Sequence, residues 1–192
     1  MLNLVLFGPP GAGKGTQSQK LIARYHLTHI STGDLFRKHL GEGTSLGIRA
    51  RTFMDVGKLV PDALVIDMVD DKLREESDSQ GIIFDGFPRT IPQAEALDQF
   101  LSTYNSRIAG MIALSVPTEE LVSRLLHRGK TSGRADDQNE EKIATRLEVY
   151  QRETLPVARY YEDQDKYVEI DGVGEIDTIF QKIVTTVEGW RT

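Results

Sequence analysis

The sequence predicts an α/β fold in which helices cover both faces of a central parallel sheet. Short apolar runs alternate along the chain with longer segments of helical character, which is the pattern of strand–helix–strand units. The first run, Leu2 to Phe7, is almost wholly apolar, as a strand buried on both faces would be. A glycine-rich stretch follows this run directly and leads into a helical segment.

The expected strands and helices can be placed in order along the chain. Pro61, Pro117 and Asn139 mark helix starts, because proline suits the first turn of a helix and asparagine caps it. Pro156 is expected to kink its helix, and residues 129–139 lack periodicity and are expected to form a loop. Strands are expected at 2–7, 28–30, 81–85, 110–116 and 167–170, and helices at 13–25, 33–40, 46–56, 62–74, 91–103, 117–127, 140–161 and 175–190.

Length and composition narrow the class of protein. The 192 residues suit one domain, and the helices between residues 33 and 74 indicate a small helical lobe inserted in it. The net charge of −6 disfavours general nucleic-acid binding. The chain has no cysteine, which excludes disulfides and thiolate metal sites and fits a reducing compartment. No apolar run approaches ~18 residues and the start of the chain is not basic, so we expect neither a membrane span nor a signal peptide.

Residues 8–16, GPPGAGKGT, have the character of a phosphate-binding loop. Gly8, Gly13 and Lys14 match the pattern Gly-x4-Gly-Lys-Ser/Thr, but Gly15 stands where the hydroxyl is expected, and the hydroxyl follows at Thr16. The backbone N–H groups of such a loop, the positive end of the next helix and the lysine charge all favour phosphate. A purely structural turn would not explain why loop, lysine, preceding strand and following helix occur together.

Asp85 ends the apolar run IIFD, at the carboxyl end of an expected parallel strand. Ligands bind at this edge of an α/β sheet. An acidic residue there can hold Mg²⁺ directly or through water. Aspartates at such positions also serve as helix caps or lie at the surface, but the phosphate-binding loop favours the metal role.

Arginines are frequent in this acidic chain, with 14 Arg against 9 Lys. Arg124 and Arg128 lie four residues apart on one expected helix face, Arg134 stands in the loop SGRADD, and Arg146 lies on the next helix. Guanidinium groups suit phosphate oxygens, but a solvated, salt-bridged surface would explain the arginines alone equally well. An arginine-bearing loop between two arginine-bearing helices, in a chain with a phosphate-binding loop, favours a closing phosphate clamp. Further arginines in STGDLFR and DGFPRT indicate a second phosphorylated ligand.

Five segments resemble, in order and spacing, the motifs of the adenylate kinase family: GPPGAGKGTQ, STGDLFR, GKLVPD, DGFPRTIPQAEAL and SGRADD. The resemblance covers essentially the whole chain, and it accounts for the late hydroxyl because the loop of this family reads GKGT. It implies a P-loop three-layer sandwich, with a central five-stranded parallel sheet, helices on both faces, a small helical AMP-binding lobe and a short lid loop. Within a single domain of residues 1–192, the core would comprise 1–30, 62–128 and 139–192, the AMP-binding lobe 31–61 and the lid 129–138.

The resemblance also implies roles for single residues. Gln93 would face the adenine ring of AMP, where a side-chain amide can both donate and accept, and Asp85 would hold Mg²⁺ through water. The expected ATP-binding residues are Gly11, Ala12, Gly13, Lys14, Gly15, Thr16, Arg124, Arg128 and Gly174. The expected AMP-binding residues are Thr32, Arg37, Lys58, Leu59, Val60, Gly86, Phe87, Pro88, Arg89, Gln93, Arg134 and Arg146. The expected catalytic residues are Lys14, Asp85, Arg89, Arg124, Arg128, Arg134 and Arg146.

The implied reaction is reversible, Mg²⁺-dependent transfer of the terminal phosphoryl group of ATP to AMP, giving two ADP. The attacking phosphate oxygen is already an anion, so no general base is needed, and His26, His29, His39 and His127 are expected to be packing or surface residues. Lobe and lid would close over the substrates to exclude water. The short stretch GKTSGRADDQN between the arginine helices makes structural zinc unexpected. The resemblance further implies a cytoplasmic monomer whose partners are ATP, AMP and ADP, with no nucleic acid and no membrane.

Several alternatives stand beside this interpretation. A UMP/CMP kinase would share the fold, but in that family an asparagine-rich segment follows DGFPR, whereas residues 90–93 here read TIPQ. A GTPase would carry an Asn-Lys-x-Asp motif, and the chain has no Asn-Lys pair. A non-catalytic nucleotide sensor would be expected to lack the lysine, the aspartate or the arginines of the site. Thr32 could also serve only as a helix cap, and Asp136 and Asp137 only as a polar lead-in to the next helix.

Overall fold

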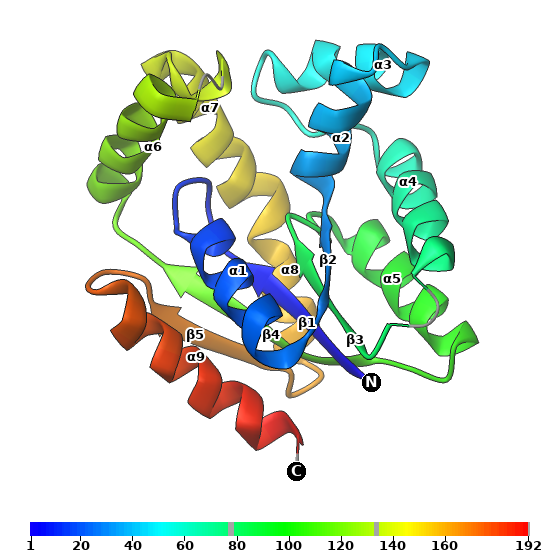
Figure 1. Ribbon diagram of the computed structural model, residues 1–192. Helices are drawn as coiled ribbons and strands as arrows, with labels where there is room; N and C mark the ends of the chain where they lie inside the picture. Colours follow the sequence, from blue (N-terminus) through cyan, green and yellow to red (C-terminus); the bar gives the residue numbers. More distant parts are fainter. Residues whose placement is uncertain (77–78, 133–134, 192) are drawn as a thin grey trace.

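The computed structural model describes residues 1–76, 79–132 and 135–191. Five strands form one all-parallel sheet in the order β2-β3-β1-β4-β5, which Figure 1 shows at the centre of the molecule. The predicted α/β fold with a central five-stranded parallel sheet is thereby confirmed. The strands are β1 (Leu2–Phe7), β2 (Thr28–Ser31), β3 (Gly81–Asp85), β4 (Ile108–Ser115) and β5 (Tyr167–Asp171).

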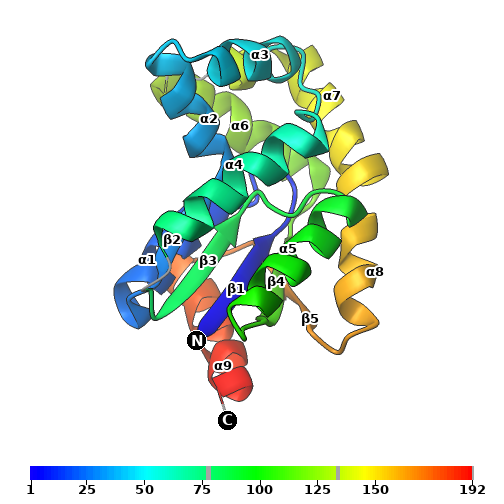
Figure 2. The same cartoon turned by 90° about the vertical axis from the view of Figure 1, so that its right-hand side faces the viewer.

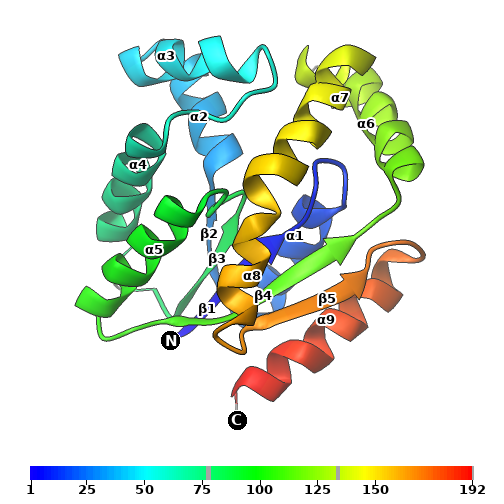
Figure 3. The same ribbon diagram turned by 180° about the vertical axis from the view of Figure 1, so that it is seen from behind.

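Helices cover the sheet on both faces. In Figure 1, α1 and α9 lie in front of the sheet, and Figure 3 shows α5 and α8 on the opposite face. The helices are α1 (Lys14–Tyr25), α2 (Thr32–Gly41), α3 (Ser45–Met54), α4 (Asp62–Glu75), α5 (Ile91–Thr103), α6 (Thr118–Ser132), α7 (Glu140–Val149), α8 (Pro156–Glu162) and α9 (Ile176–Arg191). Within the described ranges, no helix is both long enough and apolar enough to cross a membrane.

The central strand β1 is apolar because it is buried on both faces. It pairs with β3 on one side and with β4 on the other, so neither of its edges is free. Leu4 and Leu6 pack into the core on the α1 and α9 side, while Val5 and Phe7 pack into the core on the α5 and α8 side. All four side chains are at most 4% exposed. The period-2 alternation of a strand therefore divides one continuous apolar run between two cores.

Two helical projections extend beyond the carboxyl ends of the strands. Figure 1 shows α2 and α3 together on one side of this end and α6 and α7 on the other, and in Figure 2 both projections lie above the sheet. Gly47, in the first turn of α3, lies close against α2, since a Cβ atom at this position would lie 2.4 Å from the carbonyl of His39. Ser31 caps α2 by accepting a hydrogen bond from Asp34 N, so Thr32 is the first helical residue and not the cap.

The prediction of a loop at residues 129–139 is partly wrong. Helix α6 continues to Ser132, and a short 3₁₀ turn follows at Ala135–Asp137. Gly129 lacks a side chain where the chain returns, because a Cβ atom there would lie 2.5 Å from the carbonyl oxygen of Asp137. Glycine often follows the end of a helix, but Gly129 lies inside α6, where it permits this close contact. Asn139 caps α7, as predicted, by accepting from Glu141 N at 2.8 Å.

The helix that contains Pro156 is interrupted, as predicted, but the irregularity precedes the proline. A π-helical turn, Tyr150–Thr154, joins α7 to α8, and Leu155 N donates to Tyr150 O at 2.8 Å. Pro156 then occupies the first turn of α8, where a missing N–H does no harm. The wider turn brings the side chains of Tyr150 and Thr154 to the cavity described next.

Candidate active site

A cavity of about 730 Å³ opens at the carboxyl end of the sheet. Its walls come from the loop between β1 and α1, the end of β3, helices α2, α6 and α7, and the loop after β5. A smaller hollow of about 60 Å³ shares Lys58, Leu59, Gly86 and Arg89 with it and reaches Gln93 on α5. The site therefore has one large compartment and one small compartment that meet along a common wall.

The predicted site residues that the structure describes all line one compartment or the other. Arg134 lies outside the described residues. The large cavity is lined by Gly11, Ala12, Gly13, Lys14, Gly15, Thr16, Arg37, Lys58, Leu59, Asp85, Gly86, Phe87, Pro88, Arg89, Arg124, Arg128, Arg146 and Gly174. Thr32, Val60 and Gln93 line the small hollow.

The glycine loop wraps around the amine of Lys14. Gly8, Gly11 and Gly13 all have positive φ, which an L side chain rarely adopts. This path turns the carbonyls of Gly8 and Pro9 toward Lys14 Nζ, which donates to them at 2.8 and 2.9 Å. No atom lies within 4 Å of the Cβ position of Gly13, so the start of α1 faces open space. Backbone N–H groups at an open helix start favour an anion.

Positive charges gather around Lys14. Burial, together with the charges of the nearby Arg89, Arg146 and Arg128, lowers the pKa of Lys14 to about 8, against the opposing effect of Asp85. Burial and the charge of Arg146 likewise lower the pKa of Arg89 to about 10. Such mutual repulsion is relieved by a bound polyanion, so the cavity favours a ligand with several negative charges.

Asp85 provides a negative charge near Lys14 and Arg89. It ends β3, and its side chain is 15% exposed. Burial alone would raise the pKa of Asp85, but the facing His29 and the charges of Lys14 and Arg89 outweigh burial and lower it. Asp85 Oδ2 lies 3.9 Å from His29 Nε2. The carboxylate is thus ionised at neutral pH and faces the cavity.

The turn after β3 fixes the side chain of Arg89. Gly86 has φ +74, and its carbonyl oxygen accepts from Arg89 Nε at 2.7 Å and from Thr32 Oγ1 at 2.8 Å. A Cβ atom on Gly86 would lie 2.8 Å from the Arg89 guanidinium. A residue with a side chain would therefore displace this cation, which lies on the wall between the two compartments.

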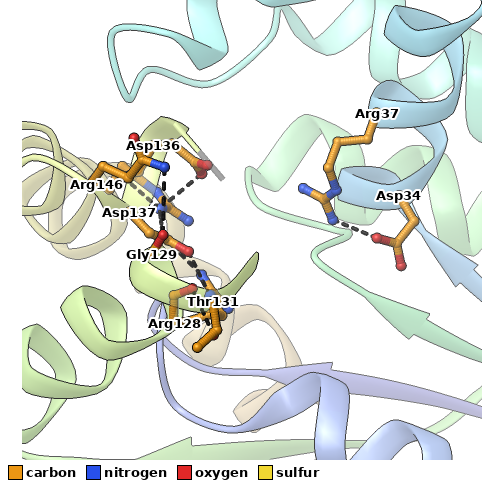
Figure 4. Close-up of polar contacts among 9 residues, drawn as sticks. Asp34, Arg37, Arg128, Gly129, Thr131, Asp136, Asp137 and Arg146 are labelled. Carbon is orange, nitrogen blue, oxygen red and sulfur yellow. Dashed lines mark hydrogen bonds and ion pairs between the residues drawn. The ribbon is translucent and has the colours of Figure 1, made fainter. Parts of the chain in front are cut away.

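Two aspartates hold the arginines of α6 and α7, as Figure 4 shows. Asp137 accepts from Arg128 Nε at 2.6 Å and Nη2 at 3.0 Å, and from Arg146 Nη1 at 2.6 Å. Asp136 Oδ2 lies 2.9 Å from the same Arg146 nitrogen. Neither aspartate is only a polar lead-in to α7. Burial would raise the pKa of Asp137, but its bonds to both arginines outweigh burial and lower it.

The other two described arginines that line the large cavity, Arg124 and Arg37, also have hydrogen-bond partners. Arg124 donates to Glu120 Oε1 at 2.8 Å and to the carbonyl oxygen of Gly172 at 3.2 Å, which ties α6 to the loop after β5. Arg37 pairs with Asp34 on α2, on the opposite side of the gap from the Asp137 cluster in Figure 4. The arginines thus approach the cavity from both projections.

The sequence alone did not point to every residue of the cavity. His29, interpreted as a packing or surface residue, lines the cavity beside Asp85. Its place two residues before the end of β2 is a usable signal, because strand ends meet at the site. Tyr150 and Thr154 enter the lining through a π-helical turn, which no sequence pattern indicated.

Comparison with known proteins decides the family. A family model described as "Adenylate kinase" matches residues 6–166, which run from the end of β1 to just beyond α8 and include every motif of the cavity except the loop after β5. The chain belongs to the adenylate kinase family. It is 52% identical over 188 residues to the adenylate kinase of Flavobacterium johnsoniae, which covers 98% of this chain and 99% of the relative. Adenylate kinases of Bacteroides fragilis and Phocaeicola vulgatus are 50% and 49% identical over the same shares.

Membership of the adenylate kinase family agrees with the two-compartment site. The relatives match over nearly their full length, so the resemblance includes both helical projections as well as the sheet. The glycine loop that precedes α1 and the Arg89 turn between β3 and α5 both lie inside the matched range.

We expect the substitution Asp137→Asn to destabilise the fold by about 2 kcal/mol at pH 7, because two arginines lose a charged, buried acceptor. The pKa of Asp137 in the folded chain lies below its unfolded value, so the carboxylate stabilises the fold above about pH 4. This contribution is lost as the pH falls through the lower, folded-state pKa. The stability difference between wild type and variant should therefore shrink at pH 3.

Urea unfolding at pH 7 and pH 3 would measure this difference, with the exposed Asp163→Asn as the matched control. An equal difference at both pH values would contradict the ionic role of Asp137.

Proposed function

We propose that this protein catalyses the reversible transfer of the terminal phosphoryl group of Mg-ATP to AMP, giving two ADP. The observation that carries the proposal is the pair of compartments that meet at Arg89 and Gly86. One compartment contains the glycine loop and the cation cluster, and the other contains a buried amide at Gln93. A transfer between two nucleotides requires such an arrangement, with the phosphates meeting between two separate base sites.

In this proposal the large cavity holds ATP. The loop residues 11–16 bind its phosphates through backbone N–H groups, and the ammonium group of Lys14 exchanges its two carbonyl partners for phosphate oxygens. Arg124 and Arg128 approach the same phosphates from α6. Gly174, with φ +119 and no atom within 4 Å of its Cβ position, leaves room for the adenine ring beside the loop after β5.

The small hollow and its common wall hold AMP in this proposal. Residues 58–60 and Thr32 enclose the hollow, and Gln93 at its base offers an amide to the adenine ring. Residues 86–88 form the turn that presents Arg89, which together with Arg37 binds the AMP phosphate. Arg146 lies between the two phosphate groups, and we assign Arg134 to the same region from the sequence motif alone.

Asp85 fits the Mg²⁺ that accompanies ATP. Its carboxylate is ionised, faces the cavity and lies near Lys14. The described residues contain no group of three or more side chains that could hold a metal ion by themselves. The ion would therefore take its other ligands from phosphate oxygens and water, and Asp85 would contact it through water. When bound, Mg²⁺ neutralises phosphate charge and orients the transferring group.

The residues of the chain contribute alignment and charge, and no proton transfer is required of them. The attacking oxygen belongs to the AMP phosphate and is already an anion. Arg89 and Arg146 align this oxygen, while Lys14 and Arg128 stabilise the negative charge on the phosphoryl group during its transfer. Water would compete as the acceptor, so we propose that the lobe 31–61 and the lid 129–138 close over both substrates. We further propose a cytoplasmic monomer, as the family resemblance implies.

The direct test is ADP production from Mg-ATP with AMP, CMP, UMP and GMP offered separately. We expect strong turnover with AMP alone, because the amide of Gln93 is buried in the small hollow and matches an adenine edge. Preference for CMP or UMP would retain the phosphate site and overturn the assignment of the base site. Absence of turnover with every acceptor, despite ATP binding, would overturn the proposed reaction.

We expect Arg89→Ala to lower kcat/KM for AMP by roughly a hundredfold, while the Kd for ATP changes little. The reason is its place on the wall toward the small hollow. Initial-rate kinetics and ATP titration measure the two effects separately, with the exposed Arg191→Ala as control. Equal losses for both nucleotides would contradict the assignment.

The lowered pKa of Lys14 predicts a pH dependence of ATP binding. Below a pKa of about 8 the free protein carries the ammonium form, which the phosphates of ATP require. Above it the amine is neutral, so binding must take up a proton, and the Kd should rise by up to about tenfold per pH unit. Calorimetry between pH 7 and 9.5 measures both Kd and proton uptake. Lys14→Met should bind weakly without this pH dependence, and a flat wild-type profile would refute the prediction.

A further inference from the structure

The side chain of Gln93 is held at both ends of its amide. Its oxygen Oε1 accepts from the backbone N–H of Arg89 at 2.8 Å, and its nitrogen Nε2 donates to Asp62 Oδ1 at 2.7 Å. Asp62 is the first residue of α4, and the same carboxylate oxygen accepts from Thr90 Oγ1 at 3.0 Å. Gln93 is only 1% exposed, so water does not compete for these bonds.

The two partners have fixed polarity, and together they leave the amide a single orientation. A carboxylate accepts hydrogen bonds only, and a backbone N–H donates only. Turning the amide of Gln93 over would place its oxygen against Asp62 and its nitrogen against the N–H of Arg89. Both contacts would then be repulsive and would leave buried polar groups unpaired, which is costly.

The fixed amide retains one hydrogen-bonding position on each atom. An amide nitrogen carries two hydrogens and an amide oxygen has two lone pairs, so one donor and one acceptor remain after the bonds to Asp62 and Arg89. Gln93 lines the small hollow, whereas Asp62 is absent from the linings of both compartments. Asp62 therefore does not touch a ligand in this hollow, and of its partners Thr90 and Gln93 only Gln93 lines it.

A 6-aminopurine offers an N–H donor at its 6-amino group and an acceptor at N1, whereas a 6-oxopurine offers an acceptor at O6 and a donor at N1. An amide that can turn over pairs with either edge, and an amide that is locked pairs well with one of them only. We propose that Asp62 is a positioning residue that selects a 6-aminopurine acceptor over a 6-oxopurine acceptor by locking the Gln93 amide. This inference rests on the proposed function, which places the acceptor base at Gln93.

The sharpest probe is a pair of acceptors, AMP and inosine monophosphate, whose bases differ only at C6 and N1. The substitution Asp62→Asn replaces an obligate acceptor by an amide that can either donate or accept, so it tolerates both orientations of Gln93. We expect the ratio of kcat/KM for AMP to that for inosine monophosphate to fall about tenfold, because one of the two locking contacts is lost. The KM for ATP should stay unchanged.

A double-mutant cycle separates this role from a merely structural one. In a Gln93→Leu background, Asp62→Asn should have no further effect on the ratio, since Asp62 acts only through the amide. The control is Asp177→Asn, which removes an aspartate from the first turn of α9, where it pairs with Lys20, and should leave the ratio unchanged. Thermal unfolding of each variant checks that the fold is retained, and Asp62→Ser serves as the second variant should Asp62→Asn not fold.

The outcomes distinguish failure of the inference from failure of the proposed function. If Gln93→Leu lowers the ratio but neither Asp62→Asn nor Asp62→Ser does, the base site remains and the role of Asp62 is overturned. If Asp62→Asn still lowers the ratio in the Gln93→Leu background, the effect does not pass through the amide and the inference is overturned. If Gln93→Leu leaves the ratio unchanged, the acceptor base does not lie at Gln93, and the base-site proposal fails together with the inference.

Discussion

The site depends on one electrostatic constraint, the gathering of like charges at the carboxyl edge of the sheet. The charges of Arg89, Arg128 and Arg146 help to lower the pKa of Lys14, and the charge of Arg146 helps to lower that of Arg89, in a chain whose net charge is −6. The fold opposes this repulsion with carbonyl groups around Lys14 and with aspartates around Arg128 and Arg146. These partners hold the cations in place without filling the cavity, so a polyanionic ligand meets a preorganised site.

Strand burial explains how the cations can come from distant parts of the chain. Parallel pairing places the carboxyl ends of β1, β3 and β4 at the same edge, and each strand then leads into a turn or helix that carries site residues. Because the strands are buried on both faces, their register is fixed by two cores at once. The turns at Gly13 and Gly86 then place Lys14 and Arg89 at defined positions beyond the ends of the strands.

Features that depend on local chemistry were predictable from the sequence. The apolar run of β1, the glycine loop and the lysine follow from short-range rules, and so does Asn139 as a cap. Contacts between distant segments were not predictable in the same way. The extension of α6 past Gly129 depends on the return of the chain at Asp137, and the aspartate bonds to Arg128 and Arg146 depend on that return. The lock on Gln93 joins residues 31 positions apart, and no periodicity encodes such a contact.

The π-helical turn Tyr150–Thr154 changes the phase of the helix that it interrupts. An α-helix turns about 100° per residue, so one additional residue in a turn rotates everything beyond it relative to everything before it. Arg146 can thereby face the cavity while Val157 and Tyr161, on α8, face the core. Loss of one residue between 150 and 154 would restore a regular helix. Arg146 could then no longer face the cavity while Val157 and Tyr161 face the core.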